Sequence, residues 1–253
     1  MLFYVILLLS MKMLLSGGKK AKEHLPWAIE QLDSPDVLLI PTACSTPKSY
    51  ARKVDDYQDF FNRSGLNTEV LHTLGNRPSK TELQHKLGKA SLVYVPGGHT
   101  PTLLEEWDKF GIKDQLETFV KEPGKIYAGA SAGAIAVFSY GLVCPAKNTS
   151  TEDWDFEVRE GTGLVRAYAT VHADSVETTK TKPRVDYFAN YGRHLIATMP
   201  GVSIDNHASL LIDGQKIKAS YLDSMPDRTV IYTAGNPTTL DDVHWVDASE
   251  FTA

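Results

Sequence analysis

The chain has 253 residues, of which 42% are hydrophobic and 23% charged. These values are typical of a soluble globular protein with a buried core and argue against a disordered chain. The net charge is −5 and there is no long basic run, so we expect no nucleic-acid partner. Cys44 and Cys144 are too few for a disulfide framework, and no cluster has zinc-like spacing. We therefore expect a reducing, cytoplasmic compartment and no metal.

The N-terminus is almost entirely apolar from position 1 to position 9. This run is shorter than the ~20 residues that span a bilayer, so we expect no membrane partner. It also lacks the positive n-region and the cleavage site of a signal peptide. Met11 or Met13 is the expected start, which makes residues 1–10 an apolar extension outside the fold. A secretory or membrane-targeting role for this run stays open.

Short apolar runs alternate with helical patterns through the first half of the chain. Strands are expected at 13–16, 37–40, 69–71, 92–95 and 126–128. Helices are expected at 23–32, from 46 to about 65, from 79 onward and from 100 onward. Two of them begin with a Thr-Pro pair, at Thr46 and Thr100, and a third begins with a capping box from Ser79 to Glu82.

This alternation of strands and helices predicts the fold class. Crossover connections produce a parallel sheet, so we expect an α/β three-layer sandwich with a mainly parallel sheet and helices on both faces. Residues 209–212 and 216–220 flank Asp213-Gly214 and predict a hairpin, and 229–233 predicts a further strand. No linker or repeat divides the chain, so residues 11–253 are expected to form a single domain.

Residues 129–133 read Gly-Ala-Ser-Ala-Gly, a G-x-S-x-G motif. A nucleophilic serine needs a base to take its proton and a tight turn to expose it, and small neighbours permit that turn. The apolar stretch at 134–138 is expected to form a buried helix whose N-terminus faces the serine. Ser131 is therefore the predicted nucleophile. The alternative is a packing turn in which Ser131 only caps the helix.

Two glycines, Gly97 and Gly98, follow the predicted strand at 92–95. Turns after parallel strands meet at one edge of the sheet, where such folds form their sites. Because glycine lets the backbone approach a ligand closely, the N–H groups of Gly98 and Ala132 are predicted to bind an oxyanion. The alternative is a turn that needs glycine for its backbone conformation alone.

The general base is expected to be a histidine. His172 ends a β-like run that begins near position 165, and the end of a strand is a rigid platform. His99, beside the glycine turn, and His207 are rival candidates.

A carboxylate is expected to orient this histidine. The segment 149–155 supplies Glu152, Asp153 and Asp155 between the serine and the histidine. The alternative is a polar surface loop.

Together these motifs resemble the peptidase E (aspartyl dipeptidase) and cyanophycinase family of serine peptidases. The resemblance runs from about Met11 to about Asp213. It rests on YVPGGHT at 94–100, on AGASAGA at 128–134, which matches the family's G-x-S-A-G-A, and on G-x-G-L-V at 161–165 leading to His172.

The resemblance implies a fold like that of class I glutamine amidotransferases, which is flavodoxin-like, with serine in place of cysteine. It implies that Ser131 is the nucleophile, that His172 is the general base and then acid, and that Gly98 and Ala132 bind the oxyanion. By position Asp153 is the expected acid, followed by Glu152. The chain departs from the family in the context of this acid and in a longer stretch after the serine. No cofactor is implied.

The resemblance also implies a small peptide substrate with an N-terminal aspartate. Arginine binds a carboxylate in a bidentate manner, so a cationic pocket is expected. Arg184 and Arg193, in the helix-like stretch 183–195, are the candidates, and Arg166 is a third. The alternative for each is a solvated surface arginine.

Two other functions stay open. An esterase of the α/β-hydrolase type also uses G-x-S-x-G, but His172 follows Ser131 too closely for the elements that such folds insert there. A base at His207 or His244 would favour that function. The second is a non-catalytic ligand-binding protein of the amidotransferase-like fold, whose signature would be an incomplete catalytic set.

Overall fold

The computed structural model describes residues 11–44, 46–75, 77–145, 155–222, 227–233 and 236–251. The predicted extension at 1–10 lies outside these ranges. Within them, no helix has both the length and the apolar character needed to cross a membrane.

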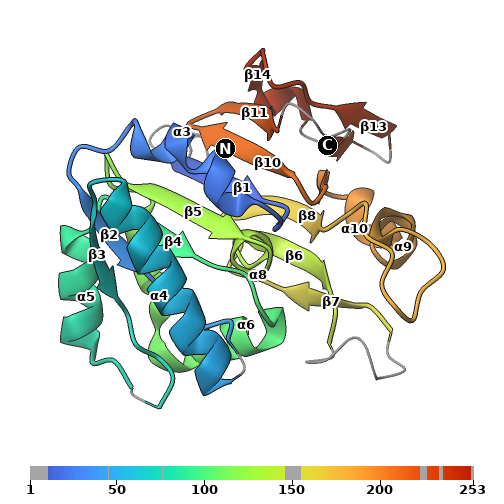
Figure 1. Ribbon diagram of the computed structural model, residues 1–253. Coiled ribbons are helices and arrows are strands. Elements are labelled where there is room, and N and C mark those ends of the chain that lie inside the picture. Colours follow the sequence, from blue (N-terminus) through green and yellow to red (C-terminus); the bar gives the residue numbers. More distant parts are fainter. Residues whose placement is uncertain are drawn as a thin grey trace.

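The larger of two sheets forms the centre of the molecule (Figure 1). Its strand order is β14 (Val246–Asp247), β11 (Lys216–Tyr221), β10 (Ala208–Asp213), β1 (Lys12–Ser16), β5 (Ile126–Ala130), β4 (Leu92–Val95), β2 (Asp36–Leu39), β3 (Asn67–Val70). The run from β1 to β3 is parallel, whereas β10, β11 and β14 are antiparallel to their neighbours. The mainly parallel core agrees with the prediction.

Helices cover both faces of this sheet. Leu92 and Tyr94 of β4 belong to the core that includes α2 (Ala21–His24), α3 (Pro26–Ile29) and α4 (Pro47–Arg63). Val93 and Val95, on the opposite face of β4, belong to the core that includes α5 (Lys80–Lys89), α6 (Thr100–Phe110), α7 (Ile112–Phe119) and α8 (Ala132–Ile135). Because successive side chains of a strand point to opposite faces, a strand buried on both sides is continuously apolar. The predicted α/β sandwich is confirmed.

A second sheet was not predicted. Its strand order is β13 (Asn236–Thr239), β12 (Thr229–Thr233), β9 (Gly201–Ile204), β8 (Val165–Val171), β6 (Phe138–Val143), β7 (Glu157–Glu160). The helices α9 (Arg184–Tyr191) and α10 (Arg193–Ile196) pack against it, with Tyr168 of β8 stacked on Phe188 of α9. The short helix η1 (Ala248–Phe251) lies near the end of the described chain.

Three local features differ from the sequence predictions: the start of α6, the extent of α8 and the turn between β10 and β11. Thr46 caps α4 and Ser79 caps α5 through their side-chain oxygens, as the sequence predicts. The cap of α6 is His99 instead of Thr100, because the His99 ring accepts the N–H of Thr102. The helix predicted at 134–138 is the shorter α8, since the chain turns directly into β6. The hairpin predicted at Asp213-Gly214 turns one residue later, because Asp213 still pairs with Lys216.

Candidate active site

Ser131 lies on a sharp turn between β5 and α8. Its backbone has φ 52° and ψ −110°, a region that residues with a side chain rarely adopt. A Cβ at Gly129 would lie 2.4 Å from the carbonyl oxygen of Gly133, and one at Gly133 would lie 2.1 Å from that of Val95. Both glycines of the motif are therefore required by close backbone packing. The turn holds the serine hydroxyl away from the strand and into a cavity.

His172 is the hydrogen-bond partner of this serine. β8 ends at Val171, and the next residue places its Nε2 atom 2.7 Å from the Oγ atom of Ser131. His172 also has a positive φ of 54°. Its ring lies directly on the backbone of Gly18, where a Cβ would come within 2.3 Å of the imidazole Cε1. The turn after β1 thus supports the ring of His172.

The other ring nitrogen of His172 contacts an asparagine. The Nδ1 atom lies 2.7 Å from the Oδ1 atom of Asn206. The Nδ2 atom of Asn206 lies 2.8 and 2.9 Å from the two carboxylate oxygens of Asp174 and 2.7 Å from the Oγ atom of Ser175. A carboxylate only accepts hydrogen bonds, so the amide must turn its NH₂ group toward Asp174 and its oxygen toward His172.

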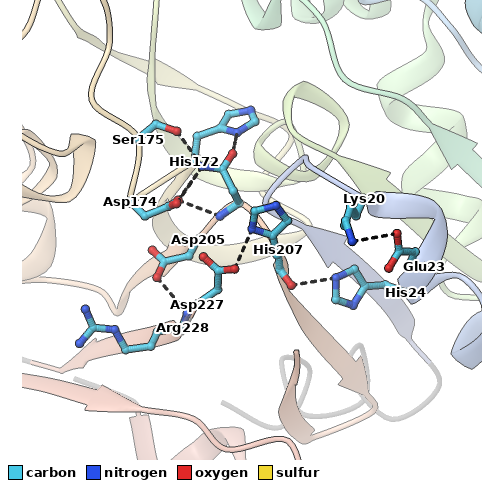
Figure 2. A network of polar contacts seen from close by, with 11 residues as sticks. Lys20, Glu23, His24, His172, Asp174, Ser175, Asp205, His207, Asp227 and Arg228 are labelled. Carbon is cyan, nitrogen blue, oxygen red and sulfur yellow. Dashed lines mark hydrogen bonds and ion pairs between the residues drawn. The ribbon is translucent and has the colours of Figure 1, made fainter. Parts of the chain in front are cut away.

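This amide orientation fixes the proton on His172. Since Oδ1 of Asn206 only accepts, Nδ1 of His172 carries the hydrogen and Nε2 is unprotonated in the neutral ring. The unprotonated nitrogen then faces the Ser131 hydroxyl, as a general base must. Figure 2 shows His172 with Asp174 and Ser175 beside it, within a network of polar contacts that extends to Asp227 and Arg228.

The surroundings of His172 favour its neutral form. Burial lowers its pKa, and the nearby positive charge of Arg184 lowers it further. The hydrogen bond to Asn206 acts in the opposite direction but is the weaker influence. The imidazole is therefore available to accept a proton at neutral pH.

The glycine turn after β4 lies against the same serine. A Cβ at Gly97 would lie 2.8 Å from the Ser131 Cβ, and one at Gly98 would lie 2.2 Å from the carbonyl oxygen of Ala43. Gly98 lines the cavity that Ser131 faces, and Ala132 begins α8, where the first N–H groups of a helix have no partner within the helix. Both predicted oxyanion donors are thus near Ser131, and their role stays a prediction.

The cavity in front of Ser131 has a volume of about 300 Å³. It is lined on one side by the turn after β2 and by α4, and on the other by β6 and α9. The residues that matter for charge are Lys53 of α4 and Arg184 of α9. Cys44 and Cys144 also line it.

The three predicted arginines have different positions. Arg184 lines the cavity but is buried, and its guanidinium pairs with Glu177 and donates to the carbonyl oxygen of Val171 at 3.1 Å. Arg193 is exposed on α10 and Arg166 is exposed near the start of β8, and neither lines this cavity. Of the three, only Arg184 is placed to meet a ligand beside Ser131.

Of the three predicted acidic residues, Asp155 lies in the described part of the chain. Asp153 and Glu152 lie outside the described residues, so their role stays a prediction. Asp155 is described, and its carboxylate is exposed and paired with Lys180. Asn206 occupies the position next to Nδ1 that the acid was expected to take.

The rival histidines are bound elsewhere. His99 caps α6 and its Nε2 atom lies 3.0 Å from the carbonyl oxygen of Pro145. His207 pairs with Asp227 at 2.8 Å, and the exposed His244 pairs with Asp241 at 3.2 Å. The geometry therefore offers no support for an esterase that uses His207 or His244 as its base.

Comparison with known proteins decides the family. The sequence profile of peptidase family S51 matches residues 8–220. The chain belongs to peptidase family S51. The resemblance to peptidase E is thereby confirmed.

Two similar curated proteins are described only as uncharacterised peptidases. PM1590 of Pasteurella multocida (strain Pm70) is 27% identical over 187 residues, which cover 73% of this chain and 84% of PM1590. YgaJ of Bacillus subtilis (strain 168) is 29% identical over 110 residues, which cover 44% of this chain and 45% of YgaJ.

Solved structures support the fold. A peptidase from an acI-B1 Actinobacterium has a TM-score of 0.68 at 16% identity, covering 97% of this chain and 99% of that one. A peptidase E-type protein from Listeria monocytogenes EGD-e has a TM-score of 0.60 at 22% identity, covering 84% and 99%. The S51 chain therefore has the class I glutamine amidotransferase-like fold that was predicted.

Sequence reasoning missed four residues of this site in the S51 chain. Asn206 and Asp174 both follow His172 in the chain, whereas the motif pattern predicts a carboxylate between the serine and the histidine. Lys53 lies in the amphipathic helix α4, and Gly18 lies in the turn after β1. The signal available for Asn206 was its place three residues before the hairpin strand predicted at 209–212.

Proposed function

We propose that this S51 protein is a serine peptidase that hydrolyses small peptides, preferably those with an N-terminal aspartate, through an acyl-enzyme on Ser131. The observation that carries the proposal is the continuous chain of hydrogen bonds from Ser131 through His172 to Asn206. Serine, histidine and an orienting amide correspond to the nucleophile, base and orienting group of known acyl-transfer sites.

The first half of the reaction forms the acyl-enzyme. Oγ of Ser131 bonds to the peptide carbonyl carbon while Nε2 of His172 takes its proton. The N–H groups of Gly98 and Ala132 bind the oxyanion that develops on the carbonyl oxygen. The C–N bond then breaks, and His172 gives its proton to the leaving amine.

The second half releases the acid. Water attacks the ester carbonyl while Nε2 of His172 takes one of its protons. The bond from carbon to Oγ of Ser131 breaks, and the serine oxygen receives that proton from His172. Asn206 holds Nδ1–H throughout, so that the ring accepts and returns protons only at Nε2.

The cavity supports the choice of substrate. A volume of about 300 Å³ is at the small end of ligand pockets, which suits a dipeptide better than a long chain. Arg184 brings positive charge to its wall, which favours an acidic side chain. Arg184 is already paired with Glu177, so that its charge is partly balanced. The low number of cysteines, with only Cys44 and Cys144 in 253 residues, suits the cytoplasmic location that we also propose.

The test is hydrolysis of Asp-Leu and Ala-Leu by the purified protein, with Ser131→Ala as control. We expect cleavage of Asp-Leu at least about tenfold faster than of Ala-Leu, since the pocket attracts the carboxylate. Both activities should disappear in the variant. Equal cleavage of both peptides would refute the aspartyl preference alone. No cleavage of either peptide would favour the alternative of a non-catalytic ligand-binding protein. The observation that supports this alternative is Asn206, an amide that lies beside His172 where a catalytic carboxylate was expected.

A further inference from the structure

Lys53 reaches into the site from α4 and contacts the backbone of the glycine turn. Its Nζ atom donates to the carbonyl oxygen of Gly97 at 2.6 Å. The side chain is half-buried and lines the cavity of Ser131. Burial lowers the pKa of Lys53, as expected for an ammonium group that has lost part of its water. Moving an ammonium group out of water costs free energy, so its position here indicates a structural or functional role.

The carbonyl that Lys53 holds belongs to the same peptide group as the N–H of Gly98. A peptide group is planar and trans, so its C=O and N–H point in opposite directions. Whatever fixes the direction of the Gly97 oxygen therefore fixes the direction of the Gly98 hydrogen. This N–H is the predicted donor to the oxyanion.

The glycine turn cannot fix this peptide group with its own side chains. Side chains are excluded at both positions, since a Cβ would meet Ser131 at Gly97 and Ala43 at Gly98. Glycine residues rotate more freely than others, so a peptide group between two of them needs an external restraint. The N–H of His99 is held by the carbonyl oxygen of Ala43 at 2.8 Å, but that bond lies one peptide group further along.

We propose that Lys53 is a positioning residue for the oxyanion site, holding the Gly97–Gly98 peptide group so that the N–H of Gly98 faces the substrate oxygen after attack by Ser131. The inference rests on the proposed serine-peptidase function. A charged donor on the carbonyl also polarises the peptide group and makes its N–H a stronger donor. The contribution of Lys53 is therefore made in the transition state more than in the bound substrate.

The other role open to Lys53 is direct binding of an acidic substrate. An ammonium has three hydrogens, and only one is used by Gly97. The two roles predict different effects of a Lys53 substitution on the kinetic constants. A positioning residue affects kcat for acidic and neutral substrates alike, whereas a substrate-binding charge affects KM and only for acidic ones.

The experiment compares wild type with Lys53→Met, Lys53→Arg and the exposed neighbour Arg52→Met. Steady-state kinetics are measured on Asp-Leu and Ala-Leu, together with inhibition by the corresponding peptide aldehyde, whose adduct with Ser131 carries an oxyanion. We expect Lys53→Met to lower kcat roughly 10- to 100-fold on both substrates, with KM changed less than about threefold. Its inhibition constant for the aldehyde should rise by the same factor.

Lys53→Arg, which keeps a charged donor, should recover most of the loss, and Arg52→Met should resemble wild type. Melting temperatures establish that each variant is folded. A loss restricted to Asp-Leu, a rise in KM alone, or an unchanged kcat would overturn the inference. Phosphonate labelling of Ser131 in wild type keeps the two proposals separate. An unlabelled wild-type Ser131 refutes the serine-peptidase function and the inference with it, whereas equal labelling rates for wild type and Lys53→Met refute the inference alone.

Discussion

At the scale of single residues, the site depends on an amide that is oriented by a carboxylate. Asn206 contacts His172 directly, and Asp174 contacts Asn206 through both of its oxygens. The negative charge is therefore one residue further from the imidazole than in a serine–histidine–aspartate triad. The amide oxygen of Asn206 only accepts a hydrogen bond, so it places the proton of the neutral His172 ring on Nδ1.

Exchanging the amide and the carboxylate tests this arrangement. Asn206→Asp alone places two carboxylates within about 3 Å of each other, so the pair retains a proton and its orientation is lost. We expect kcat/KM to fall on the order of 10²-fold. Adding Asp174→Asn restores one amide and one carboxylate in reversed positions, and most of the activity should return. A double variant no better than Asn206→Asp would contradict the account.

At the scale of elements, the turns that follow the strands bring the residues of the candidate active site together, and the strands position these turns. The turn after β1 brings Gly18 against His172, the turn after β4 brings Gly97 against Ser131, and the turn after β5 carries Ser131 itself. The sequence predicted these strands and the two glycine turns at 97–98 and 129–133, because buried parallel strands leave continuous apolar runs. Which side chains meet across the turns depends on contacts between distant segments, and no local pattern encodes them.

Replacing Gly18 tests the support of His172 by the turn after β1. Gly18 has φ +131°, and a Cβ would lie 2.3 Å from the ring. Gly18→Ala should therefore displace His172 and lower kcat/KM on the order of 10²-fold. Gly65→Ala is the matched control, because Gly65 also has a positive φ but no atom within 4 Å of the added Cβ. Both variants should lose about 1 kcal/mol of stability. Equal kcat/KM in the two variants would exclude a special role for Gly18.

At the scale of the whole molecule, the site lies where the two sheets meet. Ser131 leaves β5 of the larger sheet and leads through α8 to β6 of the smaller one, and His172 follows β8 of that smaller sheet. The segment 205–207 returns the chain from β9 to β10. Sequence reasoning predicted one sheet, because strands of four to seven residues without a regular spacing give weak signals. Asn206 lies on this return segment, between β9 and β10.

The return segment also affects the pH dependence of stability. Burial raises the pKa of Asp205 from 3.8 to about 6, and the neighbouring carboxylates of Asp174 and Asp227 add to this. The folded state thus holds a proton more tightly than the unfolded state, so Asp205 makes stability fall as the pH rises from about 3.8 to about 6.

Asp205→Asn should remove this penalty while keeping an acceptor for the N–H of Arg228. We expect a gain on the order of 1 kcal/mol at pH 8, discounted for partial exposure, which corresponds to about 2–4 °C in Tm. The gain should be smaller at pH 5. Asp242→Asn, an exposed carboxylate, controls for the change in net charge. An equal shift in both variants, or no shift at pH 8, would contradict the prediction.

The central claim is that Ser131 is a nucleophile activated by His172. The most direct measurement is intact-mass analysis after a fluorophosphonate reaction, with peptide mapping, on wild type, Ser131→Ala and His172→Ala. The account predicts one phosphonate per chain on Ser131 of wild type, none on Ser131→Ala, and labelling slowed by roughly 10²-fold or more in His172→Ala. Unlabelled wild-type protein, or labelling of Ser131 at the same rate without His172, would contradict it.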